Sequence, residues 1–270
     1  AEAIGRLNST LEGGVQCHFV SVVGEDAAGR AVLASLTSAG VDVAHVRTVE
    51  GAATACYVGV FDEGGQPVAG VADMSILNTI SSSLLPDSVL SGASMLVMDA
   101  NIPPPELEKL VVRAKALGVP TLFEPTSVAK CRGGVSKEGW ILGFDYITPN
   151  NKELECMTGK AAACHLDRMA MGDVPTILVT EGHKGVRYVT SPPPGEKTLG
   201  FGSVPPPGGG VPSEKVVNAT GCGDCFTAGF VHALVMGTPL RESIEFGQEC
   251  AKLALKEEGA VPKGLEVLRI

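Results

Sequence analysis

The chain has 270 residues, of which 44% are apolar and 19% are charged. This is the composition of an ordinary globular protein, and the length suits one large α/β domain or two small ones. A net charge of −9 at pH 7 and a pI near 5.1 argue against a surface that binds nucleic acid or an anionic membrane. No apolar run approaches the roughly 20 residues that a membrane helix needs. We therefore expect neither nucleic acid nor a membrane among its partners.

The eight cysteines are scattered through apolar segments, unlike the disulfide framework of a secreted protein. The sequence shows no charged-then-apolar signal peptide, and we expect a cytoplasmic or other reduced intracellular compartment. Cys222 and Cys225 form one C-x-x-C motif, but a metal site would need a second pair of ligands. A redox pair at a helix N-terminus, where thiol pKa values fall, is the less favoured alternative.

The predicted elements begin with residues 17–24, a nearly continuous apolar run that is typical of a strand buried on both faces. His18 lies in this run, and we expect its ring to pack in the core. A helix is predicted over residues 30–39, because Gly40 provides a stop signal after it.

Two β-rich segments follow, and they predict a hairpin that protrudes as a flap over residues 52–74. The segments are residues 54–61 and 67–72, and the turn between them is at 62–66.

Strands and helices alternate through the rest of the chain. Strands are predicted at residues 95–99, 119–123, 146–148, 176–180 and 185–189. Helices are predicted at residues 103–117, 127–131, 150–157, 225–236 and 239–257. Residues 191–212 hold two Pro-Pro-Pro runs and a Gly-Gly-Gly, which predict an irregular surface excursion. The alternation favours an α/β fold with a mostly parallel sheet covered on both faces.

One stretch near the C-terminal end has the features of an anion site. Val216 and Val217 predict a short strand, and residues 220–223 form a glycine-rich turn that leads into a helix. The glycines let a ligand approach the backbone, and the helix points unpaired N–H groups and its positive dipole end at the same place. Such a site suits a phosphate group. Asp224, in the first helical turn, is either a helix cap or a general base beside that anion.

Polar residues recur directly after the predicted strands. They are Asp99, Asn101, Glu124, Asn150, Thr180 and the stretch 218–224. In sheets of this kind the ligand crevice lies at the carboxyl ends of the strands. The sequence therefore predicts an active site at this edge of the sheet.

The chain resembles the ribokinase-like (PfkB) carbohydrate and nucleoside kinases from Gly24-x-Asp26-x-x-Gly29 to Gly259-Ala260. The most specific part is Asn-Ala-Thr-Gly-Cys-Gly-Asp at residues 218–224, which is similar to the family's D-T-x-G-A-G-D signature. The resemblance implies a single three-layer α/β/α domain over residues 1–270, with a mostly parallel central sheet and the small β flap as a lid. It also implies that Asp224 is the catalytic base of a phosphotransferase. The anion hole would be formed by Gly221, Cys222 and Gly223, with Thr220 beside the nucleotide.

The same resemblance implies ATP and Mg²⁺ as cofactors. Asn150-x-x-Glu153 is similar to the family's N-x-x-E motif, in which the two residues reach the metal through water. The same pair is also a helix N-cap with its capping-box partner, and that reading stays open. Residues 180–185 are similar to the T-x-G-x-x-G turn that lies along the nucleotide, which implies contacts from Thr180, Gly182, Lys184 and Gly185. Gln248 falls near the position that lines the adenine pocket.

Within the family, the subgroup of pseudouridine kinases is the most similar. The shared features are Asn218 at the start of the signature, Ala72-Asp73-Met74, Asp99-Ala100-Asn101 and Phe123-Glu124-Pro125-Thr126-Ser127. The implied reaction is transfer of the ATP γ-phosphate to the 5′-hydroxyl of pseudouridine. The implied acceptor-binding residues are Asp73, Asn101, Glu124, Thr54 and Asp26, with Asp26 open to the alternative of a turn or cap residue. Thr54 and Tyr57 would close over the acceptor on the flap.

The sequence departs from the family in several places. The N-terminal strand with its Gly-Gly turn is absent, and we expect a segment before Ala1. Asn218 removes a carboxylate associated with monovalent-cation activation, which leaves K⁺ open. The stretch from Gly159 to Val174 is short for the helix and loop of the family. A homodimer through the flap is a further expectation.

Two alternative functions remain from the sequence alone. The first is the same chemistry on another acceptor, such as ribose, adenosine or inosine. The second is a non-catalytic protein of the same fold that binds a nucleotide or nucleoside, although such a protein would not need Asp224 as a base.

Overall fold

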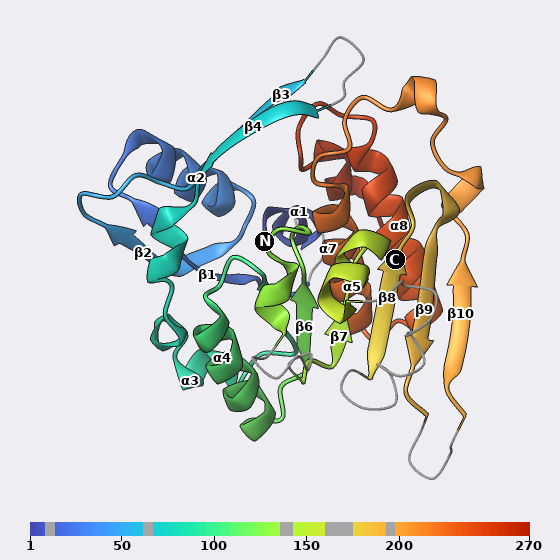
Figure 1. The fold of residues 1–270 in the computed structure, drawn as a ribbon, viewed down its shortest axis with the longest axis horizontal. Helices are drawn as coiled ribbons and strands as arrows, with labels where there is room; N and C mark the ends of the chain where they lie inside the picture. Colours follow the sequence, from blue (N-terminus) through green and yellow to red (C-terminus); the bar gives the residue numbers. More distant parts are fainter. Residues whose placement is uncertain (9–13, 62–66, 136–142, 160–174, 193–197) are drawn as a thin grey trace.

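A six-stranded sheet in the order β10–β9–β8–β7–β6–β5 lies at the centre of the fold (Figure 1). This computed structural model describes residues 1–8, 14–61, 67–135, 143–159, 175–192 and 198–270. The strands of the sheet are β5 (Leu96–Asp99), β6 (Thr121–Glu124), β7 (Tyr146–Ile147), β8 (Thr176–Thr180), β9 (Val186–Thr190) and β10 (Gly200–Val204). The strands β5 to β8 pair in parallel, and β9 and β10 add an antiparallel edge. The prediction of a mostly parallel sheet is therefore confirmed.

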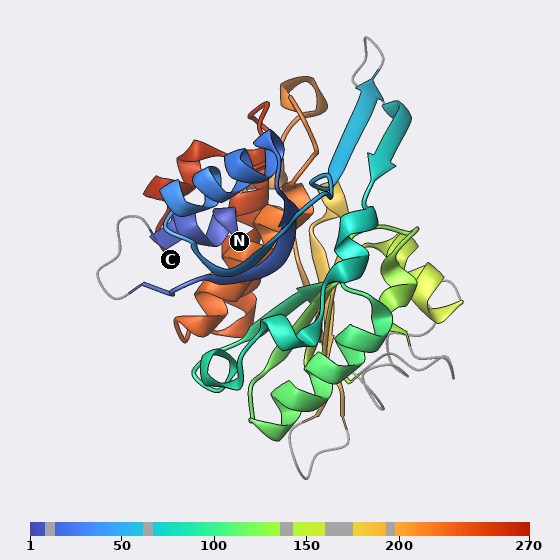
Figure 2. The ribbon, with the colours of Figure 1, turned by 90° about the vertical axis from the view of Figure 1, so that its left-hand side faces the viewer.

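Helices cover both faces of this sheet. The helices of the described chain are α1 (Glu2–Asn8), α2 (Ala27–Ser38), α3 (Asp87–Leu90), α4 (Pro104–Ala116), α5 (Asn151–Thr158), α7 (Cys222–Val235) and α8 (Leu240–Ala254). Of these, α2 packs away from this sheet, against the strands at residues 18–24 and 42–49. Seen along the sheet, α7 and α8 lie on one side and α4 and α5 on the other (Figure 2). This is the three-layer α/β/α arrangement that the sequence predicts.

The alternation of side chains along the strands builds one core on each face. Phe123 on β6 and Ile177 on β8 pack toward α4 and α5, and Phe123 stacks on Phe144 with 4.7 Å between ring centroids. The neighbouring Leu122 and Leu178 pack with Phe226, Phe230 and Ile244 of α7 and α8. Consecutive residues of a strand point to opposite faces, so strands that are apolar throughout must be covered on both sides.

A separate parallel pair of strands, β1 (His18–Gly24) and β2 (Asp42–Val49), precedes the main sheet. Here two expectations are wrong. Only the last three residues of β1 are buried, and His18 is exposed, with its Nδ1 2.7 Å from Asp42 Oδ2. The sequence reading also passed over β2, although its valines at positions 43, 46 and 49 are a β-strand signal.

The predicted hairpin strands are present as β3 (Cys56–Phe61) and β4 (Pro67–Asp73), which pair antiparallel. The predicted turn at 62–66 lies outside the described residues. The β3–β4 ribbon stands away from the body of the protein (Figures 1 and 2). Val58 and Val71 pair across it and are 57% and 75% exposed. The ribbon therefore carries apolar side chains that the described part of the chain does not cover.

Two other predictions near the C-terminal half are wrong. Residues 191–212 are not wholly irregular, because they contain β10, whose Val204 is 1% exposed and packs under α8. Glycines inside β10 conceal it in the sequence, since glycine weakens a strand pattern. Residues 216–217 form no strand. Val217 instead donates its N–H to the Leu255 carbonyl after α8 (2.8 Å), and both valines are exposed.

In the described part of the chain, no helix combines the length and the apolar character that crossing a bilayer requires.

His232, on the buried side of α7, gives the fold a measurable pH dependence. Its ring is 1% exposed, neither ring nitrogen has a hydrogen-bond partner among the described residues, and burial lowers its pKa below 6.5. Below pH 6.5 the unfolded chain takes up a proton that the folded chain refuses, so the free energy of unfolding falls as the pH falls. We predict that His232→Leu flattens this slope by up to about 1.4 kcal/mol per pH unit, measured by denaturant unfolding between pH 7 and pH 5. The exposed His183, changed to Gln, is the matched control and should keep the parent slope.

Candidate active site

Gly221 is the residue at which the chain turns into the N-terminus of α7. This residue has φ +80° and ψ −2°, and a Cβ at this position would lie 2.2 Å from the Ala260 carbonyl oxygen. Only glycine fits such a left-handed turn in that space. The amides of Gly223 and Asp224 fall in the first helical turn, where a helix offers no carbonyl partner. A Cβ on Gly223 would meet nothing within 4 Å, so no described residue packs against that side of the turn.

Asn218 fixes the loop that leads into this turn. Its Oδ1 accepts a hydrogen bond from the Thr220 amide (2.8 Å), and its Nδ2 donates to the Glu258 carbonyl (3.0 Å). Both ends of the side chain are used to join the loop to the segment after α8. The described geometry gives Asn218 a scaffolding role, and it leaves Thr220 exposed beside the turn.

Asp224 is exposed at the mouth of this turn, yet protein atoms on its other sides reduce its hydration. This loss of hydration is the main cause that raises the pKa of Asp224, and the nearby Asp99 carboxylate raises it further. The thiols of Cys222 and Cys225 are free, and burial raises their pKa values to about 11 and about 12. A thiol with a raised pKa is a poor nucleophile, which argues against the redox alternative for the C-x-x-C motif.

Glu124, at the end of β6, shows how closely the acidic groups gather. Burial raises its pKa to about 8, and the carboxylates of Asp224, Glu153 and Asp99 add to the increase. Its Oε2 accepts a hydrogen bond from the Thr126 amide (2.8 Å). The structure thus brings together acidic residues from β5, β6, α5 and α7, as expected for the carboxyl ends of parallel strands.

Asn150 and Glu153 form a complete capping box at the start of α5. Asn150 Oδ1 accepts the Glu153 amide (3.0 Å), and Glu153 Oε2 accepts the Asn150 amide (2.9 Å). Glu153 is 5% exposed, and its burial raises its pKa in spite of these hydrogen bonds. The pair therefore does cap α5. The capping box also fixes the Glu153 carboxylate close to Glu124.

The turn between β8 and β9 places the second group of predicted nucleotide residues. Thr180 ends β8, and Gly182 and Gly185 both have positive φ. A Cβ on Gly185 would lie 2.1 Å from the Val204 carbonyl oxygen, so this position requires glycine. Lys184 is exposed on the turn.

Gln248 lies where α8 meets β10. Its Nε2 donates to the Val204 carbonyl (3.0 Å), whereas its buried Oε1 has no hydrogen-bond partner among the described residues. A buried polar oxygen without a partner is costly, and a ligand that donates a hydrogen bond would satisfy it.

The predicted acceptor residues fall into two groups. Asp26 caps α2 and also accepts hydrogen bonds from the Thr54 amide (2.8 Å) and hydroxyl (2.7 Å), and these bonds lower the pKa of Asp26 to about 2. Asp73 at the end of the ribbon accepts the amide and hydroxyl of Ser75, which hold the pKa of Asp73 below its usual range. Asp26, Thr54 and Asp73 thus have clear structural uses.

Asn101 belongs to the second group, next to the acidic cluster. Its backbone and side-chain amides donate to the two carboxylate oxygens of Asp99 (3.0 and 2.7 Å), and its Oδ1 accepts from Lys130 Nζ. The sequence reading missed Lys130. The available signal was a cation in the loop after β6, where the other polar residues at the strand ends are largely acidic or neutral.

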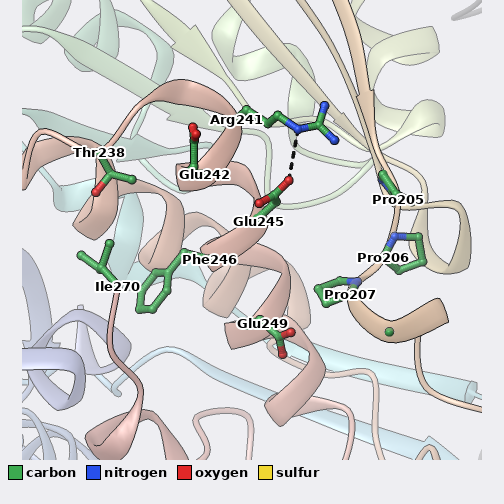
Figure 3. A pocket seen from close by; sticks show the side chains of 11 residues that line it. Pro205, Pro206, Pro207, Thr238, Arg241, Glu242, Glu245, Phe246, Glu249 and Ile270 are labelled. Carbon is green, nitrogen blue, oxygen red and sulfur yellow. Dashed lines mark ion pairs between the residues drawn. The ribbon is translucent and has the colours of Figure 1, made fainter.

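Two cavities on the described surface differ in their relation to this site. One has a volume of about 510 Å³ and lies between α8 and Pro205–Gly208, with the Arg241–Glu245 ion pair (3.1 Å) on its wall (Figure 3). Thr238 lines it beyond the far end of α7, a helix of 14 residues, which places that part roughly 20 Å from Asp224. The second cavity, of about 370 Å³, is lined by Asn101 and Lys130 and adjoins the acidic cluster.

The donor set fits a hard cation held mainly through water. Among the described residues no group of three or more His, Cys, Asp or Glu side chains is arranged to hold a metal ion directly. Burial raises the pKa of Glu124, and the neighbouring carboxylates of Asp224 and Glu153 raise it further by repulsion, which a divalent cation would relieve. Mg²⁺ usually keeps several waters and takes one or two carboxylates together with substrate phosphates.

Comparison with known proteins agrees with the geometry. A family model described as pfkB family carbohydrate kinase matches residues 3–266. The chain is similar to the pseudouridine kinase of Escherichia coli K12, with 28% identity over 254 residues, 91% of this chain and 76% of that protein. It is also similar to the ribokinase of Haemophilus influenzae, with 25% identity, 92% of this chain and 78% of that protein. The fold matches the Arabidopsis thaliana ribokinase solved with ribose and ATP (TM-score 0.76, 22% identity, 98% of this chain and 84% of that one).

The crowding of carboxylates predicts how stability responds to pH. Between pH 4.5 and about 8 the folded chain keeps a proton on Glu124 that the unfolded chain has lost, so this group makes the free energy of unfolding fall as the pH rises. Glu124→Gln should therefore be more stable than the parent at pH 8 by about 1–3 kcal/mol, with a smaller difference at pH 5, measured by urea unfolding. The exposed Glu155, changed to Gln, is the control. If the two variants changed the free energy of unfolding by the same amount at pH 5 and at pH 8, the raised pKa of Glu124 would be contradicted.

Proposed function

The chain belongs to the pfkB family of carbohydrate kinases, and we propose that it transfers the γ-phosphate of ATP to the 5′-hydroxyl of pseudouridine. The observation that supports this most is the open N-terminus of α7 with Asp224 beside it, at the carboxyl ends of the parallel strands. A site built only for binding would not need a carboxylate with a raised pKa next to an anion site.

In the proposed reaction Asp224 takes the proton of the acceptor hydroxyl. The hydroxyl oxygen then bonds to the γ-phosphorus while the bond from that phosphorus to the ADP oxygen breaks. The raised pKa of Asp224 brings it closer to the working pH, which makes it a better base than an ordinary aspartate. The amides of residues 221–223 would hold the negative charge of the phosphoryl group during transfer, with Cys222 as a small residue inside the turn. The Cys222 amide also donates to the Ala219 carbonyl (3.3 Å), so the Gly223 amide is the more available of these donors.

The nucleotide residues in this proposal come from three parts of the chain: the β8–β9 turn, the loop before α7, and α8. The β8–β9 turn contributes Thr180, Gly182, Lys184 and Gly185, and Thr220 lies at the start of α7. Gln248 would use its unpartnered Oε1 to accept a hydrogen bond from the adenine amino group. The positive φ values of Gly182 and Gly185 let the backbone approach a ligand closely, which supports this placement.

Asn150 and Glu153 would hold Mg²⁺ through water, with Glu124 nearby. When bound, the metal supplies positive charge that neutralises the phosphates. The capping box is compatible with this use, because it fixes the direction of the Glu153 carboxylate. Asn218 contributes no charge and is occupied by Thr220 and Glu258, so we include no K⁺ in the proposed reaction.

The acceptor would lie between this edge of the sheet and the β3–β4 ribbon, which we propose acts as a flap. Tyr57 lies over Gly70 across the ribbon, since a Cβ on Gly70 would be 2.6 Å from the Tyr57 hydroxyl. Glu124 is close enough to Asp224 for their charges to interact, and Asn101 is joined to the same cluster through its hydrogen bonds to Asp99. Asp26, Thr54 and Asp73 would act on the acceptor mainly by fixing the base of the flap.

The acceptor is tested by ATP consumption with pseudouridine, uridine, adenosine, ribose or no acceptor. We expect turnover with pseudouridine to exceed that with uridine and ribose by at least about tenfold, because a site that hydrogen-bonds its substrate discriminates against analogues that leave its polar groups unpaired. A preference for ribose or adenosine would replace the proposed acceptor and keep the phosphotransfer. ATP binding without turnover on any acceptor would contradict the kinase proposal.

We also propose that the chain dimerises through the ribbon. One face of the ribbon carries Val58, Val60 and Val71, all at least half exposed, and a two-stranded ribbon with free edges favours pairing. Val58→Glu combined with Val71→Glu should convert a dimer to a monomer in sedimentation or light scattering. Val112→Glu, at an exposed position on α4, is the matched control. A parent chain that is monomeric at all concentrations would contradict this prediction.

A further inference from the structure

The cavity of about 370 Å³ next to Asn101 has a composition that the proposed reaction does not yet use. Most of its wall is apolar, and its polar side chains include Asn78, Asn101 and Lys130. The full lining is Met74, Ser75, Leu77, Asn78, Ala100, Asn101, Ile102, Pro103, Pro104 and Lys130. Mostly apolar walls with a few convergent polar groups are typical of small-molecule sites.

Lys130 is held in this cavity by a short chain of contacts. Its Nζ donates to Asn101 Oδ1, and Asn101 Nδ2 donates in turn to Asp99 Oδ2 (2.7 Å). Asp99 is close enough to Asp224 to raise its pKa. The cavity that Lys130 lines is therefore joined by two hydrogen bonds to Asp99, a member of the acidic cluster that also holds Asp224.

The bond to Asn101 leaves hydrogen-bond capacity on Lys130. An ammonium has three donors, and Asn101 uses one of them. The side chain is partly buried and lines the cavity, where a charged donor gains from a partner with a strong acceptor oxygen. A planar ring with a carbonyl oxygen would satisfy the ammonium and also cover the apolar wall.

Another part of the cavity wall is held in place by packing. It is the turn of residues 75–79, which starts at the end of the ribbon and inserts Ile76 into a small core with Val22 and Ile80. Asp73 closes this turn through its two hydrogen bonds from Ser75. Asn78, on the same turn, also lines the cavity, and its side chain has both a donor and an acceptor for the rim of a ring.

We propose that this cavity takes the base of a nucleoside acceptor, and that the Lys130 ammonium donates a hydrogen bond to a ring carbonyl oxygen of that base. Asn101 is then a positioning residue, because it holds the Lys130 ammonium and is itself held by Asp99. This inference rests on the proposed function for its substrate class, and it makes carbonyl-bearing bases the preferred acceptors.

Lys130→Met tests the inference, because it keeps the length and the apolar stem but removes the donor. We expect kcat/KM for pseudouridine to fall by about 10- to 100-fold, as for the loss of a hydrogen bond to a charged group. The KM for ATP and kcat/KM for ribose, which has no base, should stay within about twofold. The kcat/KM for inosine, which has a ring carbonyl, should fall more than that for adenosine, which has none. The exposed Lys263, changed to Met, is the control for loss of a positive charge.

Equal losses for pseudouridine and ribose, or no loss for either, would overturn the inference. Calorimetric binding of pseudouridine separates its failure from that of the proposed function. If the parent binds pseudouridine but does not phosphorylate it, and Lys130→Met weakens that binding about tenfold, the kinase proposal fails and the base site stands. If the parent phosphorylates pseudouridine and Lys130→Met binds it equally well, the base site fails alone. Lys130→Gln, which keeps a neutral donor, replaces the Met variant if that variant is unfolded. It should lose part of the preference for pseudouridine over ribose in kcat/KM.

Discussion

Repulsion among carboxylates at one edge of the sheet is the constraint on which the candidate site depends. Parallel strands deliver Asp99 and Glu124 to the same edge, and the helices that follow add Glu153 and Asp224. Burial and this repulsion raise the pKa of Glu124 to about 8. Such crowding opposes folding, so it persists where surrounding packing over-determines it and where bound positive charge relieves it. The free amides at the start of α7 lie beside the crowded acids and offer an anion the opposite environment. One edge therefore accommodates both a cation and a phosphate.

The rigid parts of the fold hold this edge in place. The two cores on the faces of the sheet fix α5 and α7, whose N-termini contribute Glu153 and Asp224. Gly221 and Gly185 each sit against a carbonyl oxygen at a distance that no side chain tolerates. The β3–β4 ribbon differs, since its valines are exposed and it stands away from the body. A fixed floor with a projecting ribbon is the arrangement that closure over a substrate requires.

The sequence predicted the features that depend on local chemistry. The start of α7, the Asn150 cap and the β3–β4 pair follow from glycine, capping and alternation rules, and the structure confirms them. Features that depend on distant partners were missed or wrong. Val216 and Val217 have strand-forming side chains, but Val217 bonds to Leu255 instead of joining the sheet. His18 lies in an apolar run of the sequence, yet its ring is exposed and pairs with Asp42 on the neighbouring strand. The side chain of Lys130 bonds to Asn101, which is 29 residues away in sequence, so local patterns could not predict its place.

The most direct test of the central claim is the turnover of Asp224→Asn with ATP and pseudouridine, beside calorimetric measurement of its affinity for ATP. The account predicts that turnover falls by about 10²- to 10⁴-fold, because the amide keeps the shape of the side chain but cannot take the hydroxyl proton, while ATP affinity stays within about twofold. Glu242→Gln, in the first turn of α8, should behave like the parent chain. Parent-level turnover by Asp224→Asn with normal ATP binding would contradict the assignment of the base and of the site built around it.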